Sequence, residues 1–267
     1  MSTEKIPDPD KGTFREKVKF WFFTLFYVVT LLVNAIVYIP LDIVLSPFFP
    51  NFTHWYVWAC FRVFQAVTGV RVTVKDAHKL KNAPKGVIVI NHQTSWDFYM
   101  ICSVYHFLGD VHTVSRKEVF YLWPMGYAMW RSGSLFIDTK SPQGALAHLI
   151  SEASKLFSPQ NPKASKIIMY PEGTRNPTMG EFLQFKRGAF KVAMESNVPV
   201  IPLVSPPQFM IKNGQFFRPA KVYFTCLDPV ILDPKADLDP QIEKIKQDML
   251  AEFRRQMDEY GVKRKSA

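Results

Sequence analysis

GVIVI, at residues 86–90, runs directly into NHQTSWD, at residues 91–97. The apolar run is typical of a buried strand, and the polar residues begin where that strand ends. A strand that ends at the edge of a sheet delivers the side chains of the following turn to a cleft. Together the two runs predict a strand with a polar, chemically capable turn at its carboxyl end.

Similar β-branched runs recur on either side of this one and alternate with amphipathic stretches. We predict strands over residues 86–90, 111–115, 134–137, 166–170, 198–204 and 221–227. Between and after them we predict helices, one beginning at Ser141-Pro142, one over 185–196, and one in which Ile242, Ile245, Met249, Phe253 and Met257 recur at three- and four-residue steps. This alternation favours an α/β fold with a mostly parallel mixed sheet flanked by helices.

The N-terminal quarter is different, because residues 20–41 contain no charged residue. A helix rises about 1.5 Å per residue, so this run is long enough to cross a hydrocarbon core of ~30 Å. We therefore predict an N-terminal membrane-embedded helical segment. A second apolar stretch over 55–70 contains Arg62 and is shorter, which fits a re-entrant or interfacial helix better.

The formal net charge of +10 over 267 residues favours an anionic partner. Nucleic acid, an anionic lipid surface and a phosphorylated substrate all satisfy it. The basic residues are spread along the chain and no nucleic-acid-binding module is recognisable, so we expect no nucleic-acid partner. Cys60, Cys102 and Cys226 are scattered and odd in number, which indicates neither a disulfide framework nor a zinc site.

His92 and Asp97 are the first candidates for chemistry. A turn that leads into a helix near Thr94 can bring the imidazole back toward the carboxylate. A carboxylate that holds one ring N–H fixes the tautomer of the imidazole and stabilises its protonated form, as a general base requires. For an isolated pair the simpler interpretation is a capped helix start with an incidental histidine.

A second polar cluster, YPEGTR at residues 170–175, also follows an apolar run. Gly173 permits close approach of the backbone, and the planar guanidinium of Arg175 suits a phosphate group. Lys186 and Arg187 add cations shortly afterwards, and Lys140 follows the predicted strand at 134–137. Taken alone, the cluster is equally compatible with a turn that carries an ordinary surface arginine.

Four blocks occur together in order: N-H-x-x-x-x-D at 91–97, G-x-x-F-I-D at 133–138, E-G-T-R at 172–175 and V-P-V-I-P at 198–202. In this combination the chain resembles the glycerolipid acyltransferase family, in particular the 1-acylglycerol-3-phosphate (lysophosphatidate) acyltransferases. The resemblance covers roughly residues 85 to 205 and is supported by residues 185–190. Together with the apolar N-terminal stretches, it leads us to divide the chain into a basic cytosolic arm (1–19), a membrane-anchoring helical hairpin or span plus interfacial helix (20–70) and an acyltransferase catalytic domain (71–267).

The resemblance implies that His92 is the base for the acceptor hydroxyl and that Asp97 orients it. It further implies that the acceptor is bound by Glu172, Gly173, Thr174, Arg175, Phe136 and Lys140, with Lys117 facing an oxyanion or a phosphate. The resemblance implies acyl-CoA as the acyl donor, a co-substrate rather than a cofactor. No cofactor and no metal are expected, and no acyl-enzyme is needed because the thioester is already activated.

The expected reaction converts lysophosphatidate to phosphatidate in phospholipid biosynthesis, at the endoplasmic reticulum membrane with the catalytic domain facing the cytosol. Thr139 stands where the family usually has arginine. The same scaffold acting on another lysophospholipid or on glycerol phosphate therefore stays an alternative, as does a non-catalytic protein that binds anionic lipid. A hydrolase is less favoured, because the chain has no G-x-S-x-G motif.

Overall fold

The computed structural model describes residues 14–49, 52–176, 178, 180–212, 215–216 and 219–262. The chain forms two compact units, one of residues 1–71 and 208–221, the other of residues 72–207 and 222–267. Most of the predicted basic arm, residues 1–13, lies outside the described residues, and the predicted three-part division of the chain stays a prediction.

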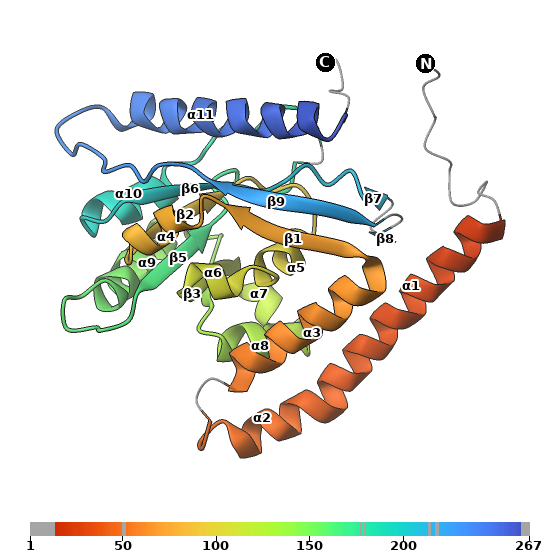
Figure 1. Cartoon of the computed structure of the whole chain (residues 1–267). Coiled ribbons are helices and arrows are strands. Elements are labelled where there is room, and N and C mark those ends of the chain that lie inside the picture. Colours follow the sequence, from red (N-terminus) through yellow and green to blue (C-terminus); the bar gives the residue numbers. More distant parts are fainter. Residues whose placement is uncertain are drawn as a thin grey trace. The chain divides into compact units, whose positions relative to one another are not determined.

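The larger unit is built on a seven-stranded sheet with the order β1-β9-β6-β2-β5-β3-β4 (Figure 1). Its strands are β1 (Val70–Lys75), β2 (Gly86–Ile90), β3 (Asp110–Arg116), β4 (Leu135–Ile137), β5 (Ser165–Met169), β6 (Val200–Val204) and β9 (Ala220–Cys226). The strands β6, β2, β5, β3 and β4 pair in parallel, and β9 pairs antiparallel to β6. The predicted mostly parallel mixed sheet is confirmed.

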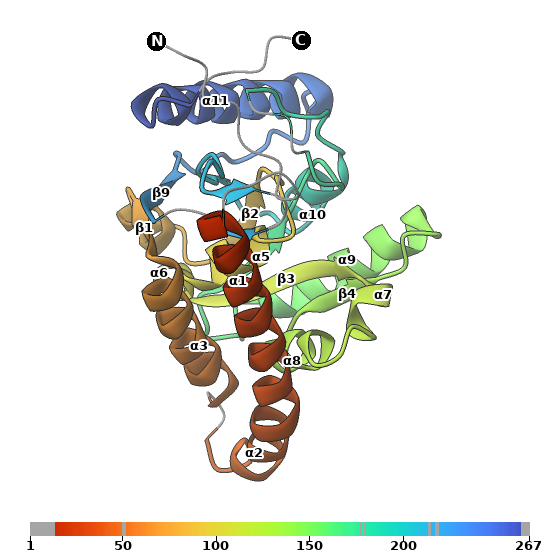
Figure 2. The same cartoon turned by 90° about the vertical axis from the view of Figure 1, so that its right-hand side faces the viewer.

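Helices cover the two faces of this sheet. They are α4 (His78–Asn82), α5 (Asp97–Cys102), α6 (Tyr105–Leu108), α7 (Lys117–Phe120), α8 (Met125–Arg131), α9 (Pro142–Leu156), α10 (Gly188–Glu195) and α11 (Leu238–Glu259). Val87 and Val89 of β2 belong to a core that also contains Phe190 of α10 and Phe253 of α11. Figures 1 and 2 show α11 on one side of the sheet and α5 and α6 on the other.

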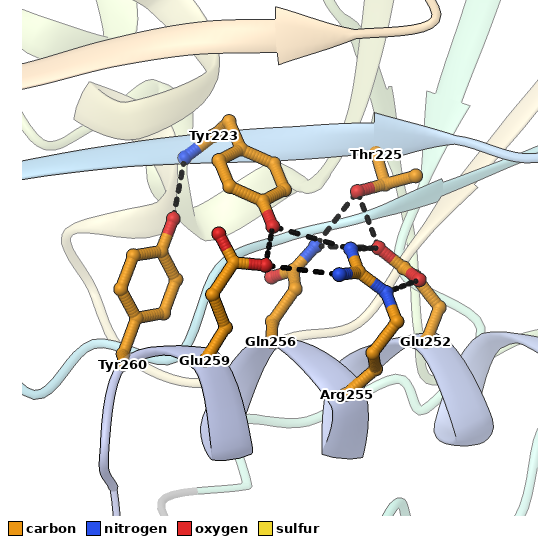
Figure 3. A network of polar contacts seen from close by, with 7 residues as sticks. All are labelled: Tyr223, Thr225, Glu252, Arg255, Gln256, Glu259 and Tyr260. Carbon is orange, nitrogen blue, oxygen red and sulfur yellow. Dashed lines mark hydrogen bonds and ion pairs between the residues drawn. The ribbon is translucent and has the colours of Figure 1, made fainter.

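The contact between α11 and β9 has a polar rim beside the apolar core (Figure 3). The Arg255 guanidinium donates to Glu252, to Glu259 and to the Tyr223 hydroxyl. Gln256 donates to the Thr225 hydroxyl at 2.9 Å. The helix begins with the Asp237 carboxylate accepting from the Asp239 N–H, an N-cap that satisfies one of the free donors of the first turn.

The smaller unit contains α1 (Phe14–Val33), a π-helix η2 (Asn34–Tyr38), α2 (Ile39–Leu45), α3 (Phe52–Thr68) and a hairpin of β7 (Ile211–Lys212) and β8 (Gln215–Phe216). A buried polar cluster joins its helices, since the Thr53 hydroxyl donates to Asp42 Oδ1 at 2.6 Å and accepts from the Tyr38 hydroxyl at 3.3 Å. The Tyr38 ring stacks on Tyr56 with a centroid distance of 4.4 Å. These contacts fix the return of the chain from α2 to α3.

The predicted membrane-embedded helix over residues 20–41 is not supported. The structure divides that apolar run among α1, η2 and α2, and α1 begins at Phe14, so four charged positions fall within its first six residues. In the part of the chain that is described, no helix combines the length and the apolar character needed to span a membrane.

Strand β1 was missed by the sequence analysis. Its residues alternate between buried and exposed, with Val70 and Val72 inside and Arg71 and Thr73 outside. This alternation indicates a strand with one wet face, but the prediction covered only its first residue, Val70, as the end of the apolar stretch over 55–70. The predicted helix over 185–196 begins later, at Gly188, because residues 182–187 form a loop that contacts the site described below.

Candidate active site

The turn after β2 brings His92 and Asp97 into contact. Asp97 is the first residue of α5 and its side chain is 2% exposed, whereas that of His92 is 22% exposed. The His92 Nδ1 lies 2.5 Å from Asp97 Oδ2. The same oxygen accepts the backbone N–H groups of Gln93 and Thr94, at 2.6 Å and 3.1 Å. Three donors converging on one oxygen hold the turn and the ring in a single arrangement.

The free side of the imidazole is available for chemistry. A carboxylate can only accept from Nδ1, so the tautomer with the proton on Nδ1 leaves a lone pair on Nε2. Among the described residues Nε2 has no hydrogen-bond partner. The ring stacks on Tyr170, with centroids 4.2 Å apart and an interplanar angle of 25°. Burial raises the pKa of the Tyr170 hydroxyl well above its usual value, so this neighbour is neutral.

Glu172 holds the backbone of His92. Its side chain is buried, and its two oxygens accept from the His92 N–H at 2.8 Å and the Leu183 N–H at 2.9 Å. The backbone of His92 is also held at its carbonyl, which accepts from the Asn176 N–H at 2.7 Å. Burial raises the pKa of the Glu172 carboxyl, and the hydrogen bonds that it accepts from the His92 and Leu183 N–H groups oppose the rise. Glu172 therefore lies where it positions the histidine.

Gly173, Thr174 and Arg175 form the exposed part of the same turn. Gly173 has a φ of +67°, and the Lys186 side chain passes so close that a Cβ on the glycine would lie 2.7 Å from its Nζ. The left-handed backbone is what favours glycine, because the flexible end of the Lys186 side chain can move aside. The Arg175 guanidinium donates to the Ser95 hydroxyl and so reaches the turn that carries His92.

Lys117, Phe136 and Lys140 come together at the ends of β3 and β4. The register of these strands pairs Arg116 with Ile137, so the next residues along each strand also meet. The Lys117 Nζ lies 2.5 Å from Asp138 Oδ2, and the Lys140 N–H donates to Asp138 Oδ1 at 2.9 Å. The hydrogen bond with Asp138 raises the pKa of Lys117, and the same bond lowers the pKa of Asp138. Phe136 packs edge-on against Phe120 with centroids 5.5 Å apart.

The sheet order explains why these clusters lie along one edge of the sheet. β2, β5, β3 and β4 are consecutive neighbours and run parallel, so the turns after them line the same edge of the sheet. Those turns hold the imidazole–carboxylate pair, the Arg175 turn and the Lys117–Asp138–Lys140 group. The arrangement offers a base beside several cations. The roles assigned to the individual residues stay predictions.

Three contributors to the site were not predicted as functional residues. The Asn91 side chain accepts from the Ser205 N–H at 2.7 Å, which fixes the end of β2 to the end of β6. The Tyr170 ring stacks on the imidazole of His92, and the Asn176 N–H donates to the backbone carbonyl of His92. Asn91 and Tyr170 stand inside or next to the quoted motifs, which is the only sequence signal for them. In the described part of the chain, no three His, Cys, Asp or Glu side chains gather in a way that suits a metal ion.

The chain is similar in sequence to several named acyltransferases. The 1-acyl-sn-glycerol-3-phosphate acyltransferase alpha of Ovis aries is 32% identical over 190 residues, which are 70% of this chain and 64% of the relative. The human protein of the same name is 32% identical over 193 residues, 70% of this chain and 65% of the relative. The 1-acyl-sn-glycerol-3-phosphate acyltransferase of Haemophilus influenzae is 28% identical over 162 residues, 61% of this chain and 65% of the relative. The chain thus spans less than two thirds of the length of these relatives.

A crystal structure titled as the 1-acyl-sn-glycerophosphate (LPA) acyltransferase PlsC of Thermotoga maritima has the same fold. The TM-score is 0.66 at 20% sequence identity, over 88% of this chain and 97% of the other. The family model described as "Acyltransferase" matches residues 71–205, which contain β2, β5 and every predicted site residue. This match covers half of the chain, and the chain therefore belongs to the acyltransferase family.

Proposed function

We propose that the protein transfers an acyl group from acyl-CoA to the free hydroxyl of lysophosphatidate, which yields phosphatidate and CoA. The observation that carries this proposal is the His92–Asp97 contact of 2.5 Å, which leaves Nε2 of the imidazole open at a sheet edge rich in cations. The names of the relatives favour a 1-acyl-sn-glycerol-3-phosphate as the acceptor.

The proposed step needs no acyl-enzyme. His92 Nε2 takes the proton of the acceptor hydroxyl while the hydroxyl oxygen attacks the thioester carbonyl. The tetrahedral intermediate collapses, the carbon–sulfur bond breaks, and the CoA sulfur leaves with a proton returned by the imidazolium. Asp97 keeps the ring oriented and stabilises its protonated form during the transfer.

The cations beside the base are assigned to the acceptor phosphate. Arg175 offers a planar fork of donors, and Lys117 and Lys140 offer point charges at the ends of neighbouring strands. Phe136 belongs to the same group, and Gly173 and Thr174 shape the turn. Thr139, in place of the arginine usual in the family, makes acceptor identity the first thing to test. Acyl-CoA is found in the cytosol, so we propose that the site faces the cytosol at the endoplasmic reticulum membrane.

Release of CoA by the purified protein tests the proposal. The protein is given oleoyl-CoA with and without lysophosphatidate, and His92→Ala is compared with His148→Ala, which removes an exposed histidine of α9. We expect release that depends on lysophosphatidate, persists in His148→Ala and falls by roughly 10² to 10⁴-fold in His92→Ala. Release without acceptor would indicate thioesterase chemistry. Release that occurs only with another lysophospholipid or with glycerol phosphate would mean that this molecule, and not lysophosphatidate, is the acceptor.

A further inference from the structure

The segment that joins α7 to α8 exposes a cluster of large apolar side chains. Tyr121 is 78% exposed, Trp123 60% and Leu122 57%, and the cluster, here called the α7–α8 surface, consists of Phe120, Tyr121, Leu122, Trp123 and Trp130. Four of these residues are consecutive in the sequence. Single exposed apolar residues are ordinary, but a contiguous apolar patch marks a binding surface.

This exposure is built into the backbone. The Gly126 backbone approaches that of α7 so closely that a Cβ at this position would lie 2.0 Å from the Phe120 carbonyl oxygen. The Gly126 N–H donates to the Leu122 carbonyl at 2.9 Å. Met129 is buried and fixes the other side of α8. These contacts hold the turn from inside, while residues 120–123 stay exposed at its surface.

The chemistry of the surface fits the interfacial layer of a membrane. Tryptophan and tyrosine are enriched at the level of lipid headgroups, where one part of the ring is apolar and another is wet. Basic residues border the aromatic cluster: Arg116 and Lys117 precede it and are exposed, and the Arg131 guanidinium lies 5.9 Å from the centre of the Trp130 ring. Glu118 is the one acidic residue from 116 to 131. Positive charge beside exposed aromatic residues complements anionic lipid.

We propose that the α7–α8 surface docks the catalytic unit onto a bilayer that contains anionic phospholipid. Phe120 of this surface packs on Phe136, and Lys117 at the start of α7 pairs with Asp138, so the surface is continuous with the candidate active site. If the acceptor is a lysophospholipid, which rests on the proposed function, docking here presents the site to the layer that holds its substrate. Binding to vesicles, by contrast, does not depend on catalysis.

A local probe separates this surface from any other part of the chain that binds lipid. Tyr121→Cys carries an environment-sensitive fluorophore in the full chain. Cys60→Ser serves as background, because Cys60 is partly exposed while Cys102 and Cys226 are buried. Ile231→Cys, labelled in the same way, is the matched control, since Ile231 is an apolar residue of the same unit that is 64% exposed and lies outside the surface. Circular dichroism checks that both labelled proteins are folded.

On addition of phosphatidylcholine vesicles containing phosphatidylserine, we expect a blue shift of the probe at position 121 and none at 231. The shift should weaken in pure phosphatidylcholine and at high salt, because exposed charges are screened beyond about 10 Å at 0.1 M ionic strength. Tyr121→Ser with Leu122→Ser should lower vesicle binding by about tenfold, whereas Ile231→Ser should not.

Three results would overturn the proposal. The probe at 121 could remain in water with vesicles present. Both probes could shift equally, which would mean no specific surface. The probe at 121 could shift without vesicles as protein concentration rises, which would identify a second copy of the chain as the occupant. None of these results bears on acyl transfer, so the proposed function and the docking surface fail independently.

Discussion

His92 has one ring nitrogen engaged by Asp97 and the other directed away from any partner among the described residues. The contact fixes which nitrogen carries the proton in the resting ring. Asp97 also accepts the N–H groups of Gln93 and Thr94, so one carboxylate both shapes the turn and orients the ring. At the scale of single residues, the proposed chemistry therefore depends on the charge of Asp97 as much as on its shape.

Replacing Asp97 with asparagine tests that dependence. The amide keeps the size of the side chain but lacks the negative charge that stabilises the imidazolium. We expect kcat to fall by roughly 10² to 10⁴-fold with little change in the KM for either substrate. Steady-state kinetics measure this, and thermal unfolding checks that the turn persists. A kcat within a few-fold of wild type would remove Asp97 from the mechanism.

Arg175 is expected to act on binding rather than on turnover. Arg175→Ala removes the guanidinium that reaches Ser95 and should raise the KM for the acceptor by about tenfold or more, with a smaller effect on kcat. Arg175→Lys keeps the charge but loses the planar fork of donors, so its acceptor KM should lie between those of wild type and Arg175→Ala. An acceptor KM equal to that of wild type in Arg175→Ala would show that the phosphate is held elsewhere.

Asp110 makes stability depend on acid pH. The hydrogen bond with His112 is the largest cause that lowers the pKa of this carboxyl far below its usual value, and the Ser165 hydroxyl adds to it against the opposing effect of burial. A lowered pKa in the folded state means that the unfolded chain binds the proton more tightly. The stabilisation is therefore present above the ordinary pKa of aspartate and is lost as the pH falls below it.

Melting temperatures measured from pH 7 down to pH 3 for wild type and Asp110→Asn test this dependence. The gap between the two proteins should be largest at about pH 5 to 6, where Asp110 is ionised and His112 is protonated, and should narrow below about pH 4. Asp248→Asn, which changes an exposed carboxyl of α11, is the control and should follow wild type throughout. A gap that stays constant with pH would mean that Asp110 does not titrate as proposed.

Among the elements, α11 contributes no residue to the candidate active site but contacts the loop beside it, at residues 180–182. The Arg254 Nε donates to the Gly180 carbonyl at 3.0 Å, and its Nη2 pairs with Glu181. Phe253 packs on Phe182 with centroids 5.2 Å apart. The loop held in this way provides the Leu183 N–H that binds Glu172, which in turn binds the His92 N–H. The helix thus supports the histidine through the 180–183 loop.

Variants of two neighbouring arginines of α11, Arg254 and Arg255, distinguish this support of the histidine from an effect on overall stability. Arg254→Ala should lower kcat several-fold at nearly unchanged KM, and Arg254→Lys should recover part of the loss. Arg255→Ala removes the ion pairs of the half-exposed Arg255 guanidinium with Glu252 and Glu259 (Figure 3), each worth about 1 kcal/mol or less, so it should shift the melting temperature by a few degrees and leave kcat unchanged. Equal kinetic effects of the two variants would contradict a specific role for Arg254.

For the molecule as a whole, the family match ends before the core is complete. It stops at residue 205, whereas β9 and α11 follow it and add a strand to the sheet and a helix to its face. The buried apolar residues of α11 are Leu238, Ile242, Ile245, Met249, Leu250, Phe253 and Met257. The segment that matches the family model therefore depends for its packing on a segment outside that match.

A chain that ends before Leu238 should not fold stably. Each buried apolar side chain of α11 contributes about 1.5–3 kcal/mol to the free energy of unfolding, whereas a whole domain is stable by only about 5–15 kcal/mol. The loss of all of these side chains therefore exceeds the stability of the domain. We expect no cooperative thermal transition in circular dichroism. A chain that ends after residue 262 retains α11 and should melt like the full protein. A cooperative transition without α11 would show that the sheet is stable alone.

Local patterns determined much of the architecture from the sequence alone. β-Branched runs predicted six strands that the structure contains, because each strand depends mainly on its own residues and on burial. The His92–Asp97 contact was predictable for the same reason, since both residues belong to one short turn. The membrane-embedded helix over 20–41 is not supported, because hydrophobicity alone does not reveal where a helix begins or where it changes to the π-helix η2.

Only the tertiary structure decided which distant residues meet. Glu172 binds the backbone of a residue 80 positions earlier, and Arg254 binds a carbonyl 74 positions earlier. Lys117 meets Asp138 because β3 and β4 pair in a particular register. No local pattern encodes these contacts, since they follow from the order β2-β5-β3-β4, which the chain adopts when its buried strands and helices pack together.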